Sequence, residues 1–200
     1  MKVKFIKSAP TIKDAIEPNY TEVALLGRSN VGKSSFLNTF TNHKIAKVSQ
    51  TPGKTKLINF FEIEDEGKKY VLVDLPGFGY AKVSKSMLKD WGKNLDEFLK
   101  NRFNIKLFIH LRDARHPDLD IDNNVDEYLK SFMRKDQQLL TVFTKIDKLK
   151  QSELAKLKQK YPNALFVSNL KKRGIEQVRK KINEILWGEY ESQDKKTDSQ

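Results

Sequence analysis

The chain contains Val23-Ala-Leu-Leu-Gly27-Arg-Ser-Asn-Val-Gly32-Lys33-Ser34-Ser35, and this stretch decides its fold. A short apolar run leads into the spacing G-x-x-x-x-G-K-S, and the residues that follow can continue as a helix. The glycines let the backbone curl, so that successive N–H groups point at a bound phosphate beside the positive end of a helix dipole. Lys33 can reach the β- and γ-phosphates, and the Ser34 hydroxyl can bind magnesium. A chance glycine turn is the alternative, but the strand–loop–helix context favours a phosphate-binding loop.

The composition indicates one soluble domain. The chain has 200 residues, 38% of them hydrophobic, which is enough for a sizeable core. It has no cysteine, so disulfides and cysteine-based zinc sites are excluded. Its apolar runs are far shorter than the roughly twenty residues that cross a bilayer, and residues 1–7 alternate in the manner of a strand rather than a signal peptide. We therefore expect a cytoplasmic protein, without membrane insertion and monomeric by default.

The charge is unusual for a protein that binds only a nucleotide. Lys and Arg number 38 against 26 acidic residues, which gives a formal net charge of +12. Such an excess favours a polyanionic partner, and RNA rather than DNA is the expected one in the cytoplasm. A lysine surface that only keeps the protein soluble is the alternative.

Hydrophobic periodicity predicts a sheet with helices on both faces. Strands are expected at 3–6, 21–26, 57–63, 70–75, 105–111, 138–144 and 164–168, and helices at 33–42, 84–101, 122–135, 152–160 and 175–187. The turn Asp65-Glu-Gly67 makes the strands that flank it antiparallel neighbours. The class is therefore α/β, a mostly parallel central sheet with one antiparallel strand and ligands at the carboxyl ends of the strands.

The same pattern divides the chain into three parts. Residues 1–20 form an edge strand and a lead-in, 21–188 form the main domain, and 189–200 are a polar tail expected to be disordered. Residues 43–56 lack periodicity and carry Pro-Gly, so they are expected to form a mobile, basic loop.

Two further strand ends carry aspartates that suit a nucleotide. Asp74 can hold magnesium through water, and Gly77 can donate its N–H to a γ-phosphate, although Asp-Leu-Pro-Gly turns are also common. In Thr144-Lys-Ile-Asp147, the Asp147 carboxylate can accept hydrogen bonds from guanine N1–H and the exocyclic amine, a pair that adenine lacks. The stem of Lys145 would lie over the base. A helix-capping aspartate is the alternative.

Two more segments complete the expected site. Ser168-Asn-Leu-Lys171 ends the last strand, where backbone amides can meet guanine O6. Thr55 can complete the magnesium shell when a γ-phosphate holds its loop closed, and Thr51 is its rival. Loops of this kind at successive strand ends predict a guanine-nucleotide switch.

The chain resembles the EngB (YihA/YsxC) family of GTPases over about residues 3–188. The resemblance rests on six segments: 27–34, Thr-Pro-Gly-Lys-Thr at 51–55, Asp-Leu-Pro-Gly-Phe-Gly-Tyr-Ala at 74–81, Asp113-Ala-Arg-His-Pro117, 144–147 and 168–171. It implies a P-loop GTPase fold, binding of GTP or GDP with Mg²⁺ and slow hydrolysis of GTP. It also implies a role in assembly of the large ribosomal subunit on its precursor and rRNA, and a requirement for normal septum formation in division.

The expected site residues follow from these segments. Nucleotide contacts are expected from Gly27, Arg28, Ser29, Asn30, Val31, Gly32, Lys33, Ser34, Ser35, Gly53, Lys54, Thr55, Lys56, Leu57, Asp74, Leu75, Pro76, Gly77, Thr144, Lys145, Ile146, Asp147, Val167, Ser168 and Asn169. Metal ligation is expected from Ser34, Thr55 and Asp74, and catalysis from Lys33, Thr55, Gly77 and Asn30.

Several residues need separate comment. Phe78 stands where many GTPases place a water-orienting glutamine, so hydrolysis should be slow without help, and a packing role for its ring is compatible with this. Asn30 matches an asparagine that binds potassium in several relatives, or else it tolerates an awkward backbone angle. Asn169 replaces a small residue of the relatives. Lys171-Lys-Arg173 can contact RNA or form a solvated surface. The three histidines lack metal-ligand spacing and are expected to be structural or exposed.

Two other functions compete with the switch. The chain could be an RNA-binding scaffold whose nucleotide only rigidifies it, or a division-site signalling GTPase. The second is disfavoured because the sequence has no lipidation motif or basic amphipathic helix with bulky apolar anchors.

Overall fold

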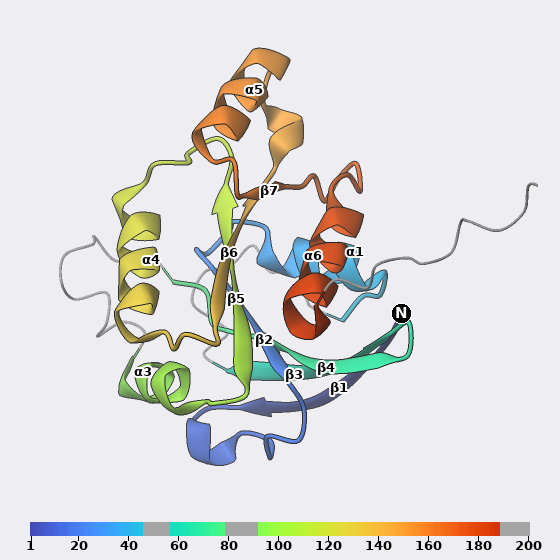
Figure 1. The fold of residues 1–200 in the computed structure, drawn as a ribbon, viewed down its shortest axis with the longest axis vertical. Coiled ribbons are helices and arrows are strands. Elements are labelled where there is room, and N and C mark those ends of the chain that lie inside the picture. Colours follow the sequence, from blue (N-terminus) through green and yellow to red (C-terminus); the bar gives the residue numbers. More distant parts are fainter. Residues whose placement is uncertain (46–56, 79–91, 189–200) are drawn as a thin grey trace, which may run out of the picture.

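A seven-stranded sheet in the order β1-β3-β4-β2-β5-β6-β7 forms the centre of the computed structural model, which describes residues 1–45, 57–78 and 92–188 (Figure 1). The strands are β1 (Lys2–Ala9), β2 (Glu22–Gly27), β3 (Ile58–Asp65), β4 (Lys68–Asp74), β5 (Ile105–Asp113), β6 (Gln138–Thr144) and β7 (Leu165–Phe166). Only β3 is antiparallel to its neighbours, β1 and β4, so the predicted mostly parallel sheet with one antiparallel strand is confirmed.

Helices cover both faces of this sheet. They are α1 (Lys33–Thr41), α3 (Gly92–Asn101), α4 (Asp120–Phe132), α5 (Gln151–Lys160) and α6 (Ile175–Trp187), with 3-10 turns η1 (Ile12–Asp14) and η2 (Ile146–Lys148). In Figure 1, α1 and α6 lie on one side of the sheet and α3 and α4 on the other. None of the helices within the described ranges is long and apolar enough to cross a membrane.

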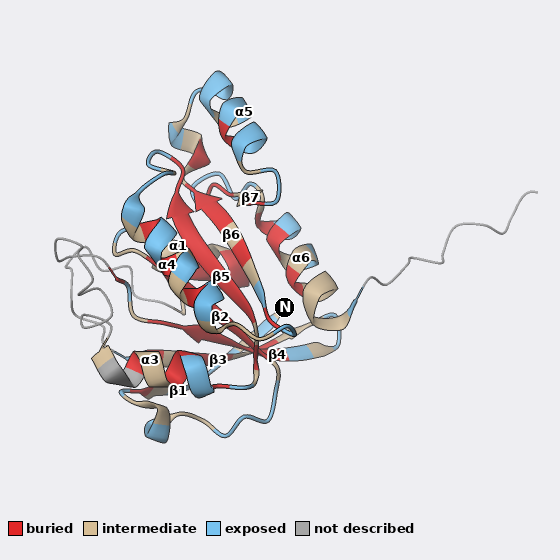
Figure 2. Ribbon diagram, turned by 60° about the vertical axis from the view of Figure 1, so that its left-hand side comes forward, coloured by how far each residue is buried: buried red, intermediate tan, exposed pale blue. Residues whose placement is uncertain are grey.

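The two sides of β2 divide the core. Val23 and Leu25 pack in the cluster that includes residues of α1 and α6, whereas Ala24 and Leu26 pack in the cluster that includes residues of α3 and α4. Because successive side chains of a strand point to opposite faces, a strand buried on both sides must be apolar at every position, as β2 largely is. Figure 2 shows this buried sheet beneath helices with exposed outer faces, and α5 is exposed along most of its length.

The last strand is shorter than predicted, two residues instead of the expected 164–168. Ser168 leaves the ladder because its N–H and C=O pair with Arg173 across a tight turn, at 3.0 and 3.1 Å. Residues 46–56 of the loop expected at 43–56, residues 84–91 of the helix expected at 84–101, and the tail at 189–200 lie outside the described residues.

Candidate functional site

The segment between β2 and α1 turns sharply at two glycines. Gly32, which directly precedes α1, has φ +100°, a conformation that residues other than glycine rarely adopt. At Gly27, an added Cβ would lie 2.9 Å from the Val31 side chain and 3.1 Å from Leu111, so the close packing of the loop on β5 needs glycine there. Asn30 has φ +64°, the awkward backbone angle considered as the alternative to potassium binding. The loop therefore has the curled backbone expected for phosphate binding.

The first residue of α1 meets the last residue of β4. The Lys33 ammonium forms an ion pair with the Asp74 carboxylate, and both side chains are largely buried. Asp74 also accepts a hydrogen bond of 3.4 Å from the Asn59 amide on β3, and the Ser8 hydroxyl donates to Asn59 at 2.6 Å. Lys33, predicted to bind phosphate, and Asp74, predicted to bind magnesium, are thus in direct contact. Asn59 of β3 and Ser8 of β1 support the Asp74 side of this pair.

The chain after β4 lies directly against the phosphate loop. The Phe78 N–H donates to the Gly27 carbonyl (3.3 Å), and the Ser29 N–H donates to the Phe78 carbonyl (2.8 Å). A Cβ on Gly77 would lie 3.2 Å from the Ser29 hydroxyl, so a larger residue would press on that loop. The Phe78 ring is buried and lies 5.6 Å from the ring of His110. The packing role considered for Phe78 is therefore present.

The two loops expected to bind a base are tied to the phosphate loop. The Thr144 hydroxyl donates to the Val31 carbonyl at 2.7 Å, and the Lys145 ammonium donates to the Asn30 carbonyl at 2.7 Å. From the loop after β7, the Asn169 amide donates to the Gly32 carbonyl at 3.3 Å. Segments more than a hundred residues apart in sequence therefore converge at the carboxyl edge of the sheet, where an α/β fold binds ligands.

Comparisons with known proteins agree with this geometry. Residues 22–145 match the model of a family described as 50S ribosome-binding GTPase. The chain is 60% identical over 187 residues to "Probable GTP-binding protein EngB" of Campylobacter lari, covering 91% of this chain and 94% of that protein. The protein of the same name from Aliarcobacter butzleri is 55% identical over 193 residues, 92% of this chain and 96% of that protein.

The chain belongs to the EngB family of GTP-binding proteins. It is a GTPase, and its ligands are GTP and GDP. Among solved structures, it resembles the crystal structure of a probable GTP-binding protein engB, with a TM-score of 0.61 and 24% identity, over 82% of this chain and 98% of that one. Era in complex with MgGDPNP and nucleotides 1506–1542 of 16S ribosomal RNA also has a TM-score of 0.61, at 22% identity, over 81% of this chain and 55% of that one. Both likenesses support the P-loop GTPase fold.

The remaining predicted site residues of this EngB-family chain occupy the same edge or fall outside the described ranges. Ser34 and Ser35 lie in the first turn of α1, Leu75 and Pro76 follow β4, Ile146 is buried in η2, and Val167 is buried after β7. Leu57 is described and exposed just before β3, whereas Gly53, Lys54, Thr55 and Lys56, together with the rival Thr51, lie outside the described residues.

A buried charged cluster under the phosphate loop was missed at the sequence level. Arg28 forms an ion pair of 3.1 Å with Asp122 of α4, and His110 lies 2.6 Å from an oxygen of Asp126. Arg112 donates to the other oxygen of Asp126, also at 2.6 Å. Burial alone would raise the pKa of Asp126, but the hydrogen bond from His110 and the charges of His110 and Arg112 hold it below its ordinary value. His110 is structural, as expected. In the sequence, the i, i+4 spacing of Asp122 and Asp126 was the available indication that two carboxylates share one face of α4.

Asp113, the last residue of β5, was named in the segment 113–117 but was not predicted as a site residue. It lies at the same edge of the sheet as the predicted residues. Its carboxylate accepts hydrogen bonds from Lys145 and Arg115. Beside it is a cavity of about 270 Å³ along the phosphate loop. Its lining residues are Arg28, Ser29, Asn30, Val31, Asp113, Arg115, His116 and Lys145.

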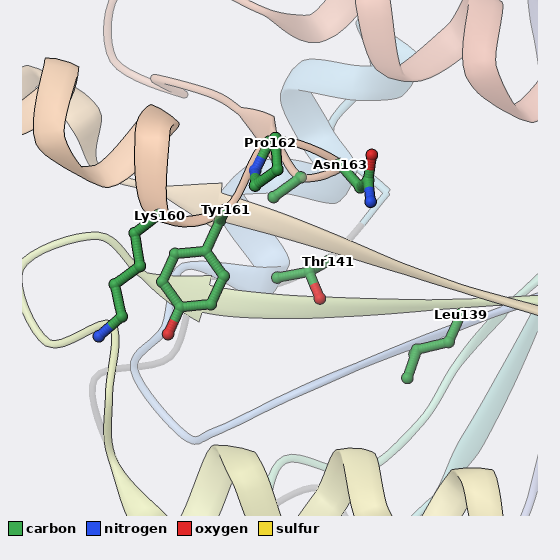
Figure 3. A pocket seen from close by; sticks show the side chains of 7 residues that line it. Leu139, Thr141, Lys160, Tyr161, Pro162 and Asn163 are labelled. Carbon is green, nitrogen blue, oxygen red and sulfur yellow. The ribbon is translucent and has the colours of Figure 1, made fainter.

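A second hollow lies away from these residues. It has a volume of about 210 Å³ and lies between β6 and the turn that ends α5 (Figure 3). The Tyr161 hydroxyl donates to Asp118 at 2.6 Å, which fixes the ring at the wall of the hollow. None of the predicted nucleotide contacts that fall in the described ranges lines it.

Proposed function

We propose that this GTPase is a switch in assembly of the large ribosomal subunit, active on its precursor and rRNA, and that normal septum formation in division depends on it. The observation that carries the proposal is the convergence of three loops on residues 27–33: Lys145 bonds to Asn30, Asn169 bonds to Gly32, and Phe78 bonds to Gly27. A nucleotide that bridged these loops would hold them in one arrangement, and its hydrolysis would release them.

Magnesium fits the oxygen donors at this edge. Mg²⁺ prefers carboxylate, hydroxyl and phosphate oxygens, and Asp74 and Ser34 supply the first two beside Lys33. We assign Ser34, Asp74 and Thr55 to the metal. When bound, the ion would neutralise charge that develops between the β- and γ-phosphates.

Lys33 and Gly77 carry the remaining positioning roles. Lys33 would balance the charge of the transferred phosphoryl group, and the Gly77 N–H would bind the γ-phosphate. Because a buried phenyl ring at position 78 cannot orient water, hydrolysis of GTP to GDP and phosphate should be slow without help. Potassium at Asn30 is the proposed help, since this residue is exposed on the phosphate loop and an amide oxygen is a suitable ligand for a hard cation.

RNA, and not DNA, is the proposed partner. The protein is proposed to act in the cytoplasm as a monomer, without insertion into membranes. The family description names the 50S ribosome, the related fold of Era has been solved with ribosomal RNA, and the net charge is +12. Lys171, Lys172 and Arg173 are exposed beside the loop that holds Ser168, so they are candidates for RNA contact.

Sedimentation of cell extract tests the proposal. With a non-hydrolysable GTP analogue, the protein should sediment with large-subunit precursors, and with GDP it should move to the top of the gradient. Cells depleted of the protein should accumulate the same precursors and divide with fewer septa. If the protein followed the same fractions with both nucleotides, the scaffold alternative would replace the switch.

A further inference from the structure

Asp113 uses its two carboxylate oxygens for two different purposes. Oδ1 accepts the backbone N–H and the Nε–H of Arg115, each at 3.0 Å, which closes the turn after β5. Oδ2 accepts the Lys145 ammonium at 2.9 Å and a second guanidinium N–H of Arg115 at 2.7 Å. Both oxygens therefore hold Arg115 in the local turn, and Oδ2 alone also reaches a loop 32 residues away.

The Lys145 ammonium is held from two sides. It donates to the carbonyl of Asn30 on the phosphate loop at 2.7 Å and to Asp113 on β5 at 2.9 Å. With its ammonium fixed, the stem of Lys145 crosses the phosphate loop, where its Cε would lie 3.9 Å from a Cβ on Gly32. A lysine held at one acceptor only would keep much of its rotamer freedom, which a ligand must then remove on binding.

We propose that Asp113 is a positioning residue for the nucleotide: it holds Lys145 across the phosphate loop, so that the lysine stem is already in place to cover the guanine base. The inference rests on the nucleotide site proposed above and extends it to a residue of the segment 113–117. Asp113 acts through Lys145 and does not itself touch the ligand.

The surroundings of Asp113 suit this role. Its side chain is almost fully buried, which alone would raise its pKa, but the hydrogen bonds from Arg115 and Lys145 outweigh burial and hold its pKa well below the ordinary value. The carboxylate is therefore charged at neutral pH. Arg115 fixes its orientation through three hydrogen bonds, so Asp113 offers Lys145 an acceptor at a set place.

Asp113→Asn separates the two purposes. With its single carbonyl oxygen on the Arg115 backbone N–H, the asparagine keeps the turn. Its NH2 group then faces the Lys145 ammonium and one Arg115 guanidinium N–H, and it cannot accept from either. We expect release of a fluorescent GDP analogue about tenfold faster than from the unchanged protein, because the lysine must be ordered anew at each binding event. The rate constant of association and the hydrolysis rate at saturating GTP should stay within about twofold, whereas KM should rise.

Asp118→Asn is the matched control. Asp118 lies in the same segment between β5 and α4. It forms an ion pair with Lys160 and accepts a hydrogen bond from Tyr161, and neither partner is a predicted nucleotide contact. Release of GDP from this variant should be unchanged. Thermal midpoints without nucleotide are measured for both variants. If Asp113→Asn does not fold, Asp113→Ser replaces it, since a serine hydroxyl can also accept the Arg115 N–H and is too short to reach Lys145.

Lys145→Met decides whether Asp113 acts through the lysine, because methionine keeps an apolar stem and has no ammonium. In the Lys145→Met background, Asp113→Asn should cause no further increase in GDP release. Independent, additive effects of the two substitutions would overturn the proposal, and so would unchanged release from Asp113→Asn alone. If the unchanged protein bound no guanine nucleotide, the proposed site itself would fail, which is a different result.

Discussion

The Ser168 hydroxyl donates a hydrogen bond of 2.5 Å to the Asp147 carboxylate, which joins the loop after β7 to the loop after β6. The same hydroxyl accepts the Lys171 N–H at 3.1 Å, so its position is set from both directions. One oxygen of Asp147 is therefore already hydrogen-bonded within the protein, which restricts how far the carboxylate can turn. A guanine that donates from N1–H and its exocyclic amine would therefore meet a carboxylate that needs little reorientation.

Asp147→Asn should exchange guanine for xanthine preference. The asparagine amide can donate to the 2-oxo group of xanthine, but it cannot accept from both N–H groups of guanine. Hydrogen bonds to charged groups contribute about 1.5–3 kcal/mol each, so GTP affinity should fall at least tenfold while XTP affinity rises. Competition of GTP and XTP against a fluorescent GDP analogue measures both. Equal GTP affinity in the variant would remove the assignment of Asp147 to the base.

Lys33→Ala should abolish most nucleotide affinity. Lys33 is the first residue of α1 and its ammonium pairs with Asp74. Its loss would leave the phosphates without a principal counter-charge and Asp74 without its ion pair. Dissociation constants for GDP and GTP from titration calorimetry should rise by at least about a hundredfold, about 3 kcal/mol. Lys2→Ala is the control, since Lys2 is highly exposed and pairs with Glu64 on β3. Affinity equal to that of the control would contradict the phosphate-loop assignment.

Potassium should accelerate GTP hydrolysis if Asn30 binds it. Replacing sodium by potassium at constant ionic strength should raise the rate several-fold in the unchanged protein, because a cation beside the β- and γ-phosphates stabilises developing charge. Asn30→Ala should remove this response and still bind GDP. Phosphate release under single-turnover conditions measures the rate. The same rate in both salts would leave the positive φ of Asn30 as the reason for an asparagine at this position.

Asp126→Asn should destabilise the protein in a pH-dependent way. His110 and Arg112 both contact this carboxylate, and His110 also lies 3.5 Å from an oxygen of Asp122. Removing one partner of such a buried set costs about 3 kcal/mol at neutral pH. The folded-state pKa of Asp126 is below the unfolded value of about 3.9, so its contribution is present above pH 4 and is lost as pH falls through the folded-state pKa.

Urea unfolding between pH 3 and 7 tests this. The gap in unfolding free energy between the unchanged protein and Asp126→Asn should narrow on the acid side. Glu127→Gln is the control, since Glu127 is exposed in the middle of the same helix and should leave stability unchanged over this pH range. A gap that stayed constant with pH would show that the Asp126 charge is not the cause.

Replacing Lys171, Lys172 and Arg173 by alanine should weaken binding to large-subunit precursors. If these residues contact phosphates, the logarithm of the affinity should fall less steeply with the logarithm of salt concentration than in the unchanged protein. The matched control replaces Lys4, Lys7 and Lys13, which are exposed on β1 and η1 at the other end of the sheet order. An equal loss in both variants would indicate that net charge alone attracts RNA.

Local patterns predicted most of the fold. The apolar run of β2 and the helical spacing of apolar residues in α6 predicted both elements to within about two residues. Apolar side chains must recur at the period of the element whose buried face they form, so the pattern identifies the element. The two-residue length of β7 was not predictable in this way, since the apolar run continues while the chain is turned aside by the pairing of Ser168 with Arg173.

The sequence by itself determined which chemical groups stand at the strand ends: a phosphate loop with Lys33, aspartates at 74 and 147, and a phenylalanine at 78. Only the tertiary structure decided which of these groups touch. The contacts of Lys145 with Asn30 and Asp113, and of Arg28 with Asp122, join residues between 32 and 115 positions apart. Periodicity records how each segment faces the core, whereas contacts between segments depend on strand order and on side-chain conformations that are selected only when the sheet is assembled.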